Sequence, residues 1–141
     1  MCLHNQNSKK KENFLSKFSH FIEPNPRSMK RLVTAFGLWK ARDILSGSYS
    51  DEDKLAQWVV LSQRWPLMAN FLEGHSWIAD IIKDEPREGW DKILKENNVN
   101  EQDRDMFLDP AIRDVLLGKG DLDEDVGKPL DSDTIRKLAS L

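Results

Sequence analysis

The sequence predicts an all-α fold, an irregular bundle of about seven to eight mostly short helices. Apolar residues recur at spacings of three and four in several segments, as they do along one face of an α-helix. A capping residue followed by proline, which is a favourable helix start, occurs at Asn25-Pro26 and again at Asp109-Pro110. No segment alternates apolar and polar residues between hairpin turns, so we expect no β-sheet.

Length and composition are those of one globular domain. The chain has 141 residues, of which 39% are hydrophobic and 32% charged, and no apolar run is long enough to span a membrane. The first residues lack the apolar centre of a secretory signal, and Cys2 is the only cysteine, so no internal disulfide can form. We therefore expect a cytoplasmic protein whose residues 1–11 are a flexible polar lead-in.

The first half of the chain is predicted to hold four helices. A short amphipathic helix runs from Phe14 to Ile22 and ends before Pro24, because the residue preceding a proline avoids the helical conformation. The longest helix follows, from about residue 26 to about residue 45. A third helix starts near Ser50 with acidic residues in its first turn and ends near Trp65-Pro66, where proline opens a fourth helix that ends near residue 74.

Shorter helices are expected in the second half. They lie around residues 77–82, from Asp84-Glu85-Pro86 through Leu94, over residues 101–108, and from Pro110 to Gly118. A helical domain would then cover residues 12–118, with an acidic loop over 119–130 and a short C-terminal helix within 131–141. Five tryptophans stand among aliphatic residues at helical spacing, so we expect them to pack in the core: Trp39, Trp58, Trp65, Trp77 and Trp90.

The longest helix begins with three cations, Arg27, Lys30 and Arg31. The N-terminus of a helix carries the positive end of its dipole, so cations there are unfavourable, and an anion is favoured. Two interpretations remain open. The three side chains extend into water at little cost, or they surround a site for an anionic group.

Charge is divided unevenly along the chain. Residues 1–47 hold nine Lys/Arg and three Asp/Glu, a net charge of +6, whereas residues 48–141 hold twelve and twenty-one, a net charge of −9. The basic part could pair with the acidic part of the same molecule, or it could face an anionic partner. A nucleic-acid surface over residues 9–42 is the weakest of these alternatives, because the acidic part would repel the backbone phosphates.

Motifs for self-contained catalysis are absent from the sequence. It has no Gly-rich phosphate loop and no nucleophile elbow, and Cys2 with His4 makes only a weak chelating pair. The run Asp121–Asp125 begins like a calcium loop, but Val126 stands where the sharp turn needs glycine and Ser132 replaces the closing glutamate. We predict neither a metal site nor an enzyme, and we interpret residues 119–130 as a solvated acidic loop.

Two motifs resemble the helical region that follows the nucleotide-binding core of KAP-type P-loop NTPases. The first is Asn25-Pro26-Arg27 followed by the pair Lys30-Arg31 and an aromatic-rich helix through Trp39. The second is the later run Val59–Pro66, which ends in Arg64-Trp65-Pro66. The resemblance covers roughly residues 14–75, and the family's phosphate loop, magnesium-binding acidic strand and parallel sheet have no counterpart in this sequence.

The resemblance implies a lid-like helical subdomain that packs beside a P-loop ATPase core. By the same resemblance Arg27 would be a nucleotide-phosphate sensor, with Lys30 and Arg31 as further candidates. The chain would be non-catalytic and would bind no cofactor alone, since ATP and Mg²⁺ would be held by a core that is missing here. Members of the family are linked to membrane-associated complexes and to phage exclusion in bacteria, so the resemblance would extend a role in phage defence to this chain.

A function from a different class is also consistent with the sequence. A basic head, an acidic body and an aromatic-rich helical surface are features of a free-standing helical protein-interaction module. The partner would then be another protein rather than an ATPase core. The sequence leaves the partner and the oligomeric state open.

Overall fold

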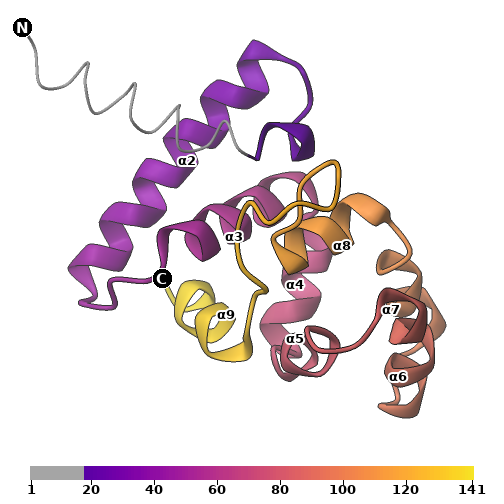
Figure 1. Cartoon of the computed structure of the whole chain (residues 1–141). Coiled ribbons are helices and arrows are strands. Elements are labelled where there is room, and N and C mark those ends of the chain that lie inside the picture. The colour runs from indigo at the N-terminus through magenta and orange to yellow at the C-terminus, as the bar shows by residue number, and fades with distance from the viewer. Residues whose placement is uncertain (1–17) are drawn as a thin grey trace, which may run out of the picture.

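The computed structural model describes residues 18–141 and confirms the all-α fold (Figure 1). The described residues contain eight α-helices and two 3₁₀ helices and no strand, with one isolated bridge between Lys119 and Asp125. The elements are η1 (Ser19–Phe21), α2 (Pro26–Leu45), α3 (Glu52–Arg64), α4 (Pro66–Gly74), α5 (Trp77–Ile82), η2 (Arg87–Gly89), α6 (Trp90–Glu96), α7 (Glu101–Met106), α8 (Pro110–Leu117) and α9 (Ser132–Ala139).

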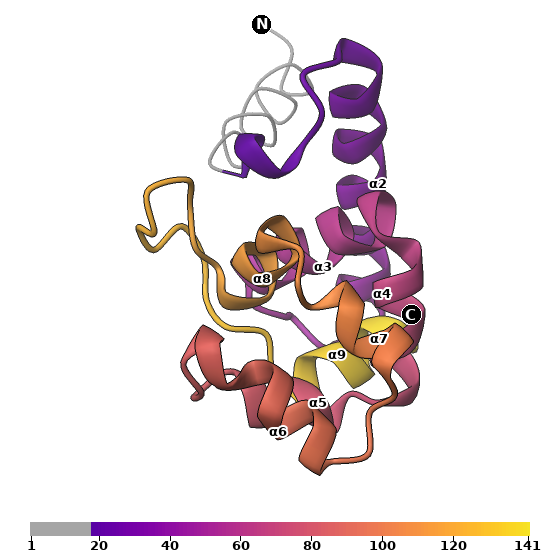
Figure 2. The ribbon, with the colours of Figure 1, turned by 90° about the vertical axis from the view of Figure 1, so that its right-hand side faces the viewer.

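Helix α3 lies at the centre of the bundle. In both orientations α2 lies at one end of the molecule and α6 lies at the other, with α3 and α8 between them (Figures 1 and 2). All residues from Leu55 to Leu61 are buried, so α3 has no solvent-exposed face over this stretch. A helix that is buried all round lies in the core, and α3 packs against α2, α4, α8 and α9.

Helix α2 begins and ends as predicted but is peripheral. Only three of its residues are buried, Leu32, Phe36 and Asp43. It packs on α3 (Figure 1), and its other residues are partly buried or exposed. The longest local helix signal in the sequence therefore belongs to an outer helix, and the shorter α3 organises the core.

One hydrophobic core joins both halves of the chain. Buried apolar residues extend from Phe18 to Leu138 in a single cluster, and α9 contributes Ile135 and Leu138 to it. The C-terminal helix is therefore part of the same core as the helices before the acidic loop.

Side-chain caps explain most of the helix starts. Asn25, Asp51, Asn100, Asp109 and Asp131 each accept a hydrogen bond from a backbone N–H in the first turn of the following helix. The helix predicted to start near Ser50 is capped by Asp51 and begins at Glu52. The Ser50 N–H and hydroxyl instead donate to the two oxygens of the buried Asp43 carboxylate, each over 2.7 Å. This contact closes the loop between α2 and α3.

Several predicted boundaries differ from the structure. The helix expected from Asp84-Glu85-Pro86 is a 3₁₀ turn, Arg87–Gly89, followed by α6 from Trp90, because Pro86 keeps an extended backbone with ψ of 146°. The helix expected over residues 101–108 ends at Met106. Only η1 is described of the helix predicted from Phe14 to Ile22. The lead-in, Cys2 and His4 lie outside the described residues.

The tryptophan prediction is confirmed in part. Trp58 and Trp90 are fully buried, and Trp39 and Trp65 are partly buried against the core. Trp77 contradicts the prediction, because 42% of it is exposed at the start of α5. The indole N–H of Trp90 donates to the Glu85 carbonyl over 3.1 Å, whereas the buried indole N–H of Trp58 has no hydrogen-bond partner among residues 18–141.

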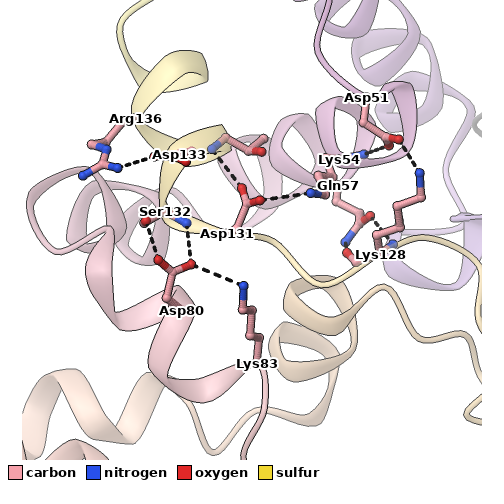
Figure 3. A network of polar contacts seen from close by, with 11 residues as sticks. Asp51, Lys54, Gln57, Asp80, Lys83, Lys128, Asp131, Ser132, Asp133 and Arg136 are labelled. Carbon is pink, nitrogen blue, oxygen red and sulfur yellow. Dashed lines mark hydrogen bonds and ion pairs between the residues drawn. The ribbon is translucent and has the colours of Figure 1, made fainter.

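A buried glutamine fastens the acidic loop to α3 (Figure 3). The Gln57 amide is inaccessible to solvent and donates to the carbonyls of Val115, over 2.8 Å, and Lys128, over 2.6 Å. Its oxygen accepts from the Lys128 N–H over 3.0 Å. Every hydrogen-bonding group of this side chain therefore faces a partner on α8 or on the loop.

Ionic and capping contacts then fix α9 (Figure 3). Ser132 donates its N–H, over 3.0 Å, and its hydroxyl, over 2.6 Å, to the Asp80 carboxylate on α5, and these bonds hold the pKa of Asp80 below its usual value. Asp131 accepts from the Thr134 N–H over 2.9 Å and from Lys54 Nζ over 3.1 Å. Burial works to raise the pKa of Asp131, but these bonds outweigh burial and lower its pKa to about 2.

Candidate functional site

The N-terminus of α2 combines a tight cap with an uncompensated positive charge. The Asn25 side chain accepts from the Arg27 N–H over 2.9 Å, and Pro26 occupies the first helical position. The first turn contains no acidic residue. The cap satisfies a backbone donor, but no carboxylate within that turn offsets the helix dipole or the cations beside it.

The three cations that the sequence predicts as site residues are exposed to solvent. Arg27, Lys30 and Arg31 are exposed, and none of them forms an ion pair with another residue of the range 18–141. Among the cations of residues 18–47, Lys40 alone pairs with the acidic part of the described chain, through Glu52. The intramolecular alternative for the charge asymmetry is therefore not realised at the start of α2.

A cleft of about 240 Å³ opens beside one of these cations, Arg31. In the part of the chain that the structure describes, three segments line it: Phe21, Ile22 and Glu23 at the end of η1, Ser28, Arg31 and Leu32 of α2, and Val60, Gln63 and Arg64 of α3. We call it the α2–α3 cleft. It brings Arg31 and Arg64, which are far apart in sequence, to one cavity.

The structure holds the Arg64 side chain in place. Its Nη1 donates to the Phe21 carbonyl, and its guanidinium lies over the Trp65 ring, 4.6 Å from the centroid. Such stacking is favourable because the face of an aromatic ring carries partial negative charge. The run Arg64-Trp65-Pro66 therefore has a local structural role at the junction of α3 and α4.

The predicted site residues separate into two groups. Arg31 lines the α2–α3 cleft, whereas Arg27 and Lys30 do not. Both motifs on which the family resemblance rests contribute to this cavity, one through Arg31 and the other through Arg64. The sequence prediction did not include Arg64 as a site residue. The pattern that could have indicated it is a cation directly before an aromatic residue and a proline at the end of a helix.

Two carboxylates of the acidic loop, those of Asp123 and Asp125, pair with cations of this chain. Arg87 contacts Asp114, over 2.5 Å, and Asp123, over 3.2 Å, and Lys119 contacts Asp125 over 2.6 Å. The hydrogen bond that Lys119 donates to the Asp125 carboxylate raises the pKa of Lys119. Within the described range, no group of three or more His, Cys, Asp and Glu side chains is arranged to hold a metal ion.

The comparisons of this chain with known proteins found no match. Neither a family model, nor a curated protein, nor a solved structure matches this chain. Between residues 18 and 141 no helix combines the length and the apolar character that crossing a membrane requires.

Proposed function

We propose that this chain is a non-catalytic helical module that packs beside a KAP-type P-loop ATPase core and presents the start of α2 to a nucleotide phosphate held by that core. One observation carries the proposal. Arg27, Lys30 and Arg31 lie exposed at the positive end of a capped helix without an ionic partner among the described residues. An anion on another molecule would relieve this unfavourable arrangement.

Arg27 is the proposed phosphate sensor. Its backbone N–H is held by Asn25, so the helix start is ordered, while its side chain is free to extend outward. A guanidinium donates two parallel hydrogen bonds to phosphate oxygens, which fixes both distance and orientation. The core would hold ATP and Mg²⁺, and the residues of this chain would supply positive charge as the γ-phosphate is transferred.

The test has two steps. The tagged protein is used to capture partners from the cells that express it, and a captured protein must contain a Gly-rich Lys-Ser/Thr phosphate loop. The ATPase rate of the reconstituted pair is then measured with Arg27→Ala. Because a hydrogen bond to a charged group contributes about 1.5–3 kcal/mol, we expect the rate to fall about 10- to 100-fold.

Arg42→Ala is the matched control, since it removes the same charge from the last turn of the same helix. The control rate should equal the unmodified rate. An unchanged rate with Arg27→Ala would remove Arg27 from the nucleotide site. The absence of any phosphate-loop protein among partners and neighbouring genes would refute the ATPase role.

A second function, a free-standing protein-interaction module, is favoured by the opposite end of α2. Large apolar residues are exposed there: Leu38 at 53%, Ile44 at 45%, Leu45 at 86% and Tyr49 at 73%. Exposed apolar surface of this kind commonly marks protein contacts. Leu38→Ser with Leu45→Ser should abolish capture of a partner that lacks a phosphate loop. A folded monomer that captures no protein would refute this function.

A further inference from the structure

The α2–α3 cleft has an apolar part and a polar part. Ile22 is partly exposed and gives the cavity apolar surface, and the other apolar lining residues, Phe21, Leu32 and Val60, are buried by 97% or more. Exposed or half-buried polar side chains complete the lining: Glu23, Ser28, Arg31, Gln63 and Arg64. A ligand that fills this cavity therefore needs an apolar group next to a hydrogen-bonding group.

Unused hydrogen-bond donors surround the polar part. The side chains of Ser28, Arg31 and Gln63 form no hydrogen bond with other residues of the described part of the chain. Arg64 uses one N–H for the Phe21 carbonyl, and an arginine has five N–H donors. That contact and the stacking on Trp65 hold the Arg64 guanidinium beside the cavity before any ligand arrives.

The charge balance selects the type of anion. Among the described residues, two guanidiniums and one carboxylate, that of Glu23, line the cleft, and together they carry a single excess positive charge. A carboxylate ligand neutralises this excess, whereas a phosphate dianion would add a second negative charge near Glu23. A carboxylate also matches the planar donor pair of a guanidinium.

The size of the cleft limits the ligand. Pockets that hold a complete small-molecule ligand measure about 300–1,000 Å³, and this cleft, at about 240 Å³, is smaller. An apolar residue at the C-terminus of a polypeptide carries a carboxylate and an apolar side chain within one residue. An internal acidic residue with an apolar neighbour needs room for two side chains.

We propose that the α2–α3 cleft binds the C-terminal apolar residue of a partner polypeptide, with Arg31 and Arg64 on its carboxylate and Ile22 against its side chain. Capture of a chain terminus by clustered donors is a known mode of peptide recognition. The inference goes beyond the proposed function, because it requires neither a nucleotide nor Arg27.

The experiment measures peptide binding to the full-length ¹⁵N-labelled protein by NMR. The probe is the peptide acetyl-Gly-Ser-Gly-Leu with a free C-terminal carboxylate, and the control probe is the same peptide with a C-terminal amide. The free acid should give saturable shifts of the Ser28, Arg31, Gln63 and Arg64 signals. The amide should bind about tenfold more weakly or less, because it lacks the charge-assisted hydrogen bonds.

Variants locate the site. Arg31→Gln should weaken binding of the free acid about tenfold, and it should leave the fold intact because Arg31 is exposed and unpaired within the described residues. Arg64→Lys keeps the charge but loses the planar donor pair, so it should weaken binding as well. Arg42→Gln lowers the charge of the same helix by one unit away from the cleft and should bind the peptide with unchanged affinity.

Three results would overturn the proposal. The first is equal binding of the acid and the amide, or no saturable shift with either peptide. The second is unchanged affinity in Arg31→Gln. The third is binding of inorganic phosphate, or of acetyl-Gly-Asp-Leu-Gly amide, as tightly as the free acid, which would assign the cleft to a phosphate or to an internal acidic segment. None of these measurements depends on ATPase activity, so the two proposals can fail separately.

Discussion

Gln57 offers a sharp test of how the acidic loop is held. Replacing it with methionine keeps the length of the side chain and removes all three of its hydrogen bonds, those to Val115 and the two to Lys128. A buried hydrogen bond contributes about 1 kcal/mol net, and an unsatisfied buried partner costs more. Because Lys128 is near solvent and can bind water after the change, we expect Gln57→Met to lower the free energy of unfolding by about 2–4 kcal/mol.

The assay is urea unfolding monitored by circular dichroism, combined with amide exchange across residues 118–131. Gln102→Met is the control, since Gln102 is exposed on α7, and its stability should change by less than about 0.5 kcal/mol. Gln57→Glu should be worse than Gln57→Met at pH 7, because a carboxylate would face two carbonyl oxygens in a buried site.

Two results would contradict the role of the Gln57 hydrogen bonds in holding the acidic loop. If Gln57→Met lost less than about 0.5 kcal/mol and exchange in the loop stayed slow, the three bonds would not hold the loop. Equal stabilities of the Met and Glu variants would likewise contradict the burial of this amide.

Three further predictions concern the core, a turn and pH. Trp58→Ala should cost about 3–5 kcal/mol because Trp58 is fully buried, and a nearly unchanged melting temperature would contradict that burial. Gly118→Ala should strongly destabilise the fold, because Gly118 has φ of 70° and an added Cβ would lie 2.4 Å from the Lys128 backbone nitrogen. The control is Gly74→Ala, whose added Cβ meets no atom within 4 Å. In the same thermal unfolding assay the control should have a nearly unchanged melting temperature. Burial works to raise the pKa of Asp131, but hydrogen bonds hold it at about 2, against about 3.9 for an unfolded aspartate, so its stabilising contribution is complete above about pH 4 and is lost as pH falls toward 2. Asp131→Asn should therefore flatten the dependence of melting temperature on pH in this window, and an unchanged slope would contradict the assignment.

Local signals explain why most helices were predictable. The start of α2 depends on Asn25 and Pro26, and the start of α8 on Asp109 and Pro110, which act within one helical turn. The boundary at α6 was less predictable, because a 3₁₀ turn from Arg87 precedes the helix and Arg87 is held by carboxylates of α8 and the acidic loop. Such long-range pairing leaves no periodic trace in the sequence.

The candidate site was predictable only in part for the same reason. The unfavourable cations at the start of α2 and their spacing are local features, so Arg27, Lys30 and Arg31 could be named from the sequence. That Arg31 shares a cleft with Arg64 depends on how α2 packs across α3, and neither helix carries a signal for that packing.

By itself, the sequence determined that the protein is helical, where most helices begin and end, and that the start of α2 is basic. Each of these properties is set by residues within a few positions of one another. Only the tertiary structure decided that α3 is the central helix, that Gln57 is a buried clamp and that Arg31 faces the same cavity as Arg64. These properties depend on contacts between residues far apart in the chain. Such contacts form when the helices bury apolar surface together, and because apolar burial is non-directional, a local stretch of sequence does not specify them.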